Sequence, residues 1–74
     1  MRLSKPQADM LDNFMIALWG ATWDDNPTII GLYEKHMDEA KIPWSLQNSA
    51  AYLVQSWRGS YWTNRLKRLG VEVI

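Results

Sequence analysis

Residues 45–74 read SLQNSAAYLVQSWRGSYWTNRLKRLGVEVI, and this stretch decides the predicted fold. Its first part carries apolar side chains that recur every three or four residues, as they do on one face of an α-helix: Leu46, Ala50, Leu53 and Trp57. Ser45 precedes the first of them and belongs to a residue type that caps helix N-termini. We therefore predict a helix over Ser45–Trp57.

A turn and a second amphipathic segment follow. Arg58-Gly59-Ser60 predicts the turn, with Ser60 as the cap of the next helix. That helix is expected over Tyr61–Leu69, and Gly70 is expected to end it, because glycine is common just past a helix C-terminus. Residues 71–74 alternate apolar and polar side chains and predict a short strand, for which the sequence shows no obvious partner.

The N-terminal half predicts two more helices. Ser4 is a plausible N-cap and Gly20 a plausible stop, and between them an apolar stripe has helical spacing: Leu11, Phe14, Met15 and Leu18. Asp24-Asp25-Asn26-Pro27 breaks the chain, because proline disfavours helix at the residue before it. A further helix is expected over Thr28–Ala40.

Length and composition bound the fold class. The chain has 74 residues, 47% apolar and 22% charged, which fits a folded domain and argues against disorder. The sequence predicts one small, mainly α domain over residues 1–74, with three to four helices and a short C-terminal strand. Leu53 and Leu66 are at the centres of the two C-terminal apolar stripes, so both are expected to be buried.

The same composition argues against several kinds of chemistry. The absence of cysteine and the single histidine, His36, argue against a metal site and a thiol nucleophile. The four glycines stand singly, so no glycine-rich phosphate loop occurs. We expect neither enzymatic activity nor a cofactor. The apolar stretch Phe14–Trp23 is too short to span a bilayer, no signal peptide is visible, and a cytoplasmic protein is expected.

Charge is distributed unevenly although the net charge is zero. Residues 1–46 hold four basic and seven acidic side chains, whereas residues 47–74 hold four basic and one acidic. The basic half supplies the candidate contact residues for a nucleic acid or a partner: Arg58, Tyr61, Asn64, Arg65, Lys67 and Arg68. Asn64 and Arg65 suit base edges, and the other cations suit phosphates. The alternative is structural, because cations near a helix C-terminus also favour the helix dipole.

The C-terminal stretch resembles part of a known DNA-binding unit. The helix from Ser45, the turn Arg58-Gly59-Ser60-Tyr61 and the run Arg65–Val73 are similar to the second half of a helix-turn-helix of the winged-helix kind. In that run, the arginine, leucine-glycine and alternating apolar positions match a recognition helix that enters a wing strand. The short, tryptophan-rich, cysteine-free chain also resembles small phage-encoded transcription regulators.

These observations lead to one functional hypothesis with two forms. The resemblance implies non-enzymatic regulation of transcription, in the host cytoplasm if the source is viral. In the first form, the helix Tyr61–Leu69 contacts double-stranded DNA. In the alternative form, the protein docks on a host protein such as bacterial RNA polymerase. A third class, an assembly subunit held through its aromatic residues, is also open. Neither a membrane nor a small-molecule cofactor is expected as a partner.

Overall fold

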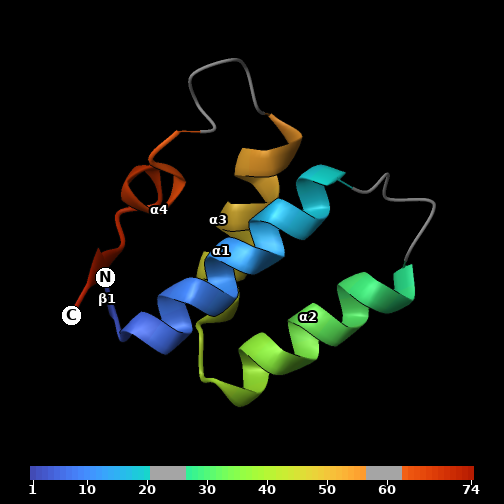
Figure 1. Ribbon diagram of the computed structural model, residues 1–74, viewed down its shortest axis with the longest axis horizontal. Helices are drawn as coiled ribbons and strands as arrows, with labels where there is room; N and C mark the ends of the chain where they lie inside the picture. The colour runs from blue at the N-terminus through green and yellow to red at the C-terminus, as the bar shows by residue number, and fades with distance from the viewer. Residues whose placement is uncertain (21–26, 57–62) are drawn as a thin grey trace.

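The computed structural model describes residues 1–20, 27–56 and 63–74, and the side chains of residues 20 and 27–30 lie outside that description. Its elements follow the chain in this order: β1 (Arg2–Leu3), α1 (Lys5–Gly20), α2 (Pro27–Glu39), α3 (Trp44–Gln55), α4 (Arg65–Arg68) and β2 (Glu72–Val73). The predicted mainly α architecture is confirmed. In Figure 1, α1 crosses the molecule between α2 and α4 and in front of α3.

The core forms around α1, which contacts α2, α3, α4 and β1. The predicted stripe on α1 is confirmed, because all four of its residues are buried: Leu11, Phe14, Met15 and Leu18. Met37 from α2 joins Leu11 and Met15 as the largest fully buried side chains among the described residues. The first helix of the chain is therefore the central element of the fold.

The expected burial of Leu53 and Leu66 is wrong in degree, since both are only partly buried at the edge of the core. On α3 the predicted Leu46 and Ala50 are buried, and Gln47 and Val54 complete the inward face in place of Leu53. Leu66 lies on α4, a single turn at the edge of the core.

The helix starts agree with the sequence at α1 and differ at α3. At α1, the Ser4 backbone N–H donates to Gln7 Oε1 (3.0 Å), and the Gln7 backbone N–H donates to Ser4 Oγ (3.3 Å), which is a capping box. At α3, the predicted cap Ser45 is wrong. The helix begins at Trp44, because the Pro43 carbonyl already accepts from the backbone N–H groups of Leu46 and Gln47.

The predicted helix over Tyr61–Leu69 is wrong in its extent. Asn64 has φ 56°, a left-handed conformation that a right-handed α-helix does not contain, and α4 starts only at Arg65. The turn at Arg58-Gly59-Ser60 and the first residues of that predicted helix lie outside the described residues. The helix predicted to reach Trp57 ends earlier, because α3 stops at Gln55 with Ser56 as its C-cap.

Two helices end in the same hydrogen-bonded motif. At α4, the Gly70 N–H donates to Lys67 O and the Val71 N–H to Leu66 O, and Gly70 has φ 74°. This is a Schellman motif, and it confirms Gly70 as the stop. At α2, Lys41 occupies the equivalent position with φ 61° and makes the equivalent bond to Asp38 O. A residue that carries a Cβ atom is thus held in a left-handed backbone conformation.

The C-terminal strand pairs with the start of the chain. β1 and β2 are parallel, with Arg2 opposite Glu72 and Leu3 opposite Val73. The backbone N–H of Glu72 donates to Met1 O (2.8 Å) and that of Ile74 to Leu3 O (2.9 Å). The partner that the sequence did not show is therefore a two-residue segment, and the two ends lie side by side (Figure 1).

Candidate functional site

The predicted contact residues do not form one surface. Arg58 and Tyr61 lie outside the described residues. Asn64, Lys67 and Arg68 are exposed around the single turn of α4, whereas Arg65 is partly buried. Only three of the six predicted residues therefore offer an exposed side chain in the part of the chain that is described.

Arg65 is directed toward α1 and not toward solvent. Its Nε lies 2.6 Å from Asp12 Oδ1, and its Nη2 donates to Asp12 Oδ2 at 2.8 Å. The two side chains are only 21% and 28% exposed. A guanidinium in an ion pair with a partly buried carboxylate has its charge matched in place. Arg65 thus joins α4 to α1, and its expected contact with base edges stays a prediction.

The remaining cations of α4 lie at its C-terminal end. The Arg68 Nε donates to the Thr63 carbonyl at 3.2 Å, a bond that folds the side chain back toward the start of the turn. Lys67 and Arg68 both belong to the last turn, where cations meet the negative end of the helix dipole. This arrangement fits the structural alternative for these residues as well as a contact with phosphate.

A different surface stands out on α3. Its exposed residues are uncharged and include two aromatic side chains; we call this set the outer face of α3: Trp44, Ser45, Asn48, Ser49, Tyr52 and Gln55. Trp44 is 64% exposed and Tyr52 is 70% exposed. Aromatic side chains left this open, without a charged neighbour on their own helix, are typical of a protein-binding surface.

The opposite side of α3 explains why this face points outward. Leu46, Ala50 and Val54 are buried against the core. Gln47 is also buried, and its Nε2 donates to Ile42 O (3.0 Å) and to Asp38 Oδ1 (2.8 Å) at the end of α2. These contacts fix the rotation of α3 and leave Tyr52 directed away from the core.

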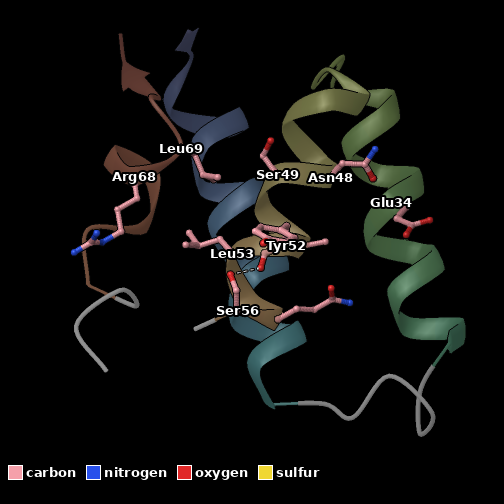
Figure 2. Close-up of a pocket in the computed structure, with 10 residues that line it drawn as sticks. Glu34, Asn48, Ser49, Tyr52, Leu53, Ser56, Arg68 and Leu69 are labelled. Carbon is pink, nitrogen blue, oxygen red and sulfur yellow. Dashed lines mark hydrogen bonds between the residues drawn. The ribbon is translucent and has the colours of Figure 1, made fainter. Parts of the chain in front are cut away.

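Tyr52 lies in an open groove of about 830 Å³ that spans α2, α3 and α4. Figure 2 shows Glu34 from α2 on one side of α3, and Arg68 from α4 on the other side. The floor between them comes from α3 and includes Leu53. The groove thus has an uncharged, aromatic centre between Glu34 and Arg68, and Figure 2 shows the Arg68 guanidinium directed outward from α3.

The serine hydroxyls of this groove are engaged in hydrogen bonds. The hydroxyl of Ser49 donates to Ser45 O (3.0 Å), and that of Ser56 donates to Tyr52 O (2.7 Å), so both are engaged with their own helix. His36 is exposed on α2, where its Nδ1 lies 3.9 Å from Glu39 Oε2, and it does not line the groove. Within the described ranges, no three His, Cys, Asp or Glu side chains are grouped to hold a metal ion.

The outer face of α3 was not predicted from the sequence, because the predicted contact residues came from the basic half of the chain. The signal was nevertheless present, since residues 42–57 contain no Asp, Glu, Lys or Arg although the chain is 22% charged. A helix of this composition with Trp and Tyr off its apolar stripe is a candidate interface.

Known proteins add nothing to this description, because no family model, curated protein or solved structure matches the chain. None of the helices in the described part of the chain is long and apolar enough to cross a membrane.

Proposed function

We propose that this chain is a non-enzymatic regulator that acts by binding a protein partner, and that the outer face of α3 is its docking surface. The observation that carries the proposal is the exposure of Trp44 (64%) and Tyr52 (70%) on a helix without charged residues. Interface centres are enriched in aromatic residues and depleted in charge, and tryptophan and tyrosine dominate their energetics. Bacterial RNA polymerase, which the sequence resemblance implies, is the heterologous partner to test first.

Double-stranded DNA is the second candidate ligand, and one specific observation favours it. Asn64, Lys67 and Arg68 are all exposed around one turn and include both cationic and amide side chains. Duplex binding nevertheless depends mainly on neutralising phosphates. The charge of Arg65 is already matched by Asp12, and the whole chain has no net charge. The geometry therefore favours a protein as the ligand.

Photo-crosslinking tests the docking surface directly. A benzophenone amino acid replaces Asn48 on the outer face of α3, and in a matched control it replaces Asn13, which is exposed on α1. After irradiation in bacterial lysate, or with purified RNA polymerase, we expect covalent protein adducts from position 48 and not from position 13. Equal adduct formation at the two positions, or none at position 48, would overturn the proposal.

Binding of a labelled duplex tests the second candidate. At about 50 mM salt, phosphate attraction is strong enough to reveal weak binding. Affinity that falls when Lys67 and Arg68 are changed to alanine would favour DNA over a protein ligand. We expect no measurable binding by the parent chain.

A further inference from the structure

We propose that the occupant of the outer face of α3 is a second copy of this chain, bound in a two-fold symmetric dimer whose axis runs parallel to α3. This inference rests on the proposed docking function of that face and names its partner. It follows from the charges at the margins of the groove, from the order of side chains along α3 and from the net charge of the chain.

The charges at the two margins are opposite in sign and lie on opposite sides of α3. Glu34 lines the groove from α2 and Arg68 lines it from α4. Figure 2 shows both at a similar height along α3, close to the level of Tyr52. A surface of this kind is complementary to itself in one orientation only.

Symmetry identifies that orientation. In a closed dimer the same patch is used by both copies, so each residue meets the symmetry mate of its contact. A two-fold axis parallel to α3 exchanges the α2 side with the α4 side. Glu34 of each copy then faces Arg68 of the other. An axis across α3 in the plane of the interface would instead place Glu34 opposite Glu34 and Arg68 opposite Arg68.

The same axis brings like side chains together along the centre of the interface. The two α3 helices run in the same direction, so Tyr52 meets Tyr52 of the second copy and Trp44 meets Trp44. Aromatic pairs gain energy in offset or edge-to-face contact. The serine and amide side chains of the outer face carry no charge that would be stranded when water leaves.

Two properties of the whole chain favour self-association. Its net charge is zero, so two copies do not repel each other at long range. A domain of 74 residues also has a small core, and oligomerisation is one of the ways in which such domains gain stability.

Sedimentation velocity over a range of concentrations tests the dimer, with the full chain at low salt. We expect the parent to dimerise, and we expect Glu34→Arg and Arg68→Glu each to weaken dimerisation by at least about tenfold, because each places like charges opposite one another. The double variant restores the opposite charges and should recover most of the affinity. Glu39→Arg and Lys67→Glu reverse exposed charges that do not line the groove, and they should leave dimerisation unchanged.

A disulfide test gives an independent measurement of the symmetry. The chain has no cysteine, so Ser49→Cys introduces a single thiol on the outer face of α3. Mild oxidation should yield a covalent dimer from Ser49→Cys and none from Asn13→Cys. Circular dichroism of every variant checks that it is folded.

The outcomes separate this inference from the proposed function. A parent that remains monomeric up to about 1 mM, the range of the weakest specific complexes, overturns the dimer. So does a double charge reversal that fails to recover affinity. If purified RNA polymerase then gives adducts at position 48, the docking function stands and the second copy is wrong. If the parent is monomeric and position 48 gives no adducts, both proposals fail.

Discussion

Replacing Arg65 with alanine removes the guanidinium that joins α4 to α1 and leaves Asp12 without its ion-pair partner. The two contacts measure 2.6 and 2.8 Å, and the side chains are 21% and 28% exposed. A hydrogen bond to a charged group contributes about 1.5–3 kcal/mol, and loss of a fully buried ion-pair partner costs about 3–5 kcal/mol. Because this pair is partly open to water, we expect the lower range, about 1.5–3 kcal/mol of unfolding free energy.

Thermal unfolding followed by circular dichroism measures this loss. In a domain of this size, 1 kcal/mol corresponds to about 4–8 °C in Tm, so Arg65→Ala should lower Tm by at least about 6 °C. Asp12→Ala should act in the same direction. The double variant should lose less than the sum of the two, with a coupling energy of about 1–2 kcal/mol.

Lys67 provides the matched control, because it lies exposed on the same turn. Lys67→Ala should change the unfolding free energy by no more than about 0.5 kcal/mol. Additive effects in the cycle, or an Arg65→Ala variant that melts like Lys67→Ala, would refute the reasoning. Arg65 would then behave as a solvent-exposed residue.

Three further predictions follow from the core, the helix ends and the paired chain termini. Met15→Ala should cost about 2–5 kcal/mol because Met15 is fully buried, and Leu53→Ala should cost less because Leu53 lies at the edge of the core; denaturant unfolding compares the two. Lys41→Gly should raise Tm and Gly70→Ala should lower it, because the left-handed conformation of a residue with a Cβ costs about 1–2 kcal/mol. A Cβ at Gly70 would meet no atom within 4 Å, so the backbone conformation alone should determine the effect, and Tm shifts of the same sign would contradict this. Deletion of residues 1–3 removes the buried Leu3 and the carbonyls that bind β2, so the amides of Glu72 and Ile74 should lose protection in hydrogen exchange.

The spacing and type of neighbouring residues predicted those parts of the fold that depend only on neighbouring residues. The α1 stripe from Leu11 to Leu18 is buried as predicted, because helical spacing places these side chains on one face whatever packs against them. Gly70 ends α4 as predicted, because glycine adopts the left-handed conformation needed there without a steric cost from a Cβ atom. The starts of α3 and α4 depended on choices between neighbouring residues, and there Pro43 and Asn64 decided the boundary.

Contacts between distant parts of the chain explain what the sequence did not predict. The sequence assigned Arg65 to the contact residues of the basic half, but Arg65 pairs with Asp12, 53 residues away. The partner of β2 is only two residues long and carries no strand pattern of its own. The outer face of α3 carries no charged residue, so the uneven distribution of charge along the chain does not reveal it.

The parallel pairing of the chain ends determines how the protein meets mechanical force. A pull between residue 1 and residue 74 draws β1 backward and β2 forward along the strand direction, because both strands point the same way. The bonds from Met1 to Gly70, from Glu72 to Met1 and from Ile74 to Leu3 are then loaded together in shear, whereas antiparallel ends would peel open one bond at a time. The β1–β2 pair is thus the part of the fold that first resists tension, and the helices bear no load until its hydrogen bonds break together.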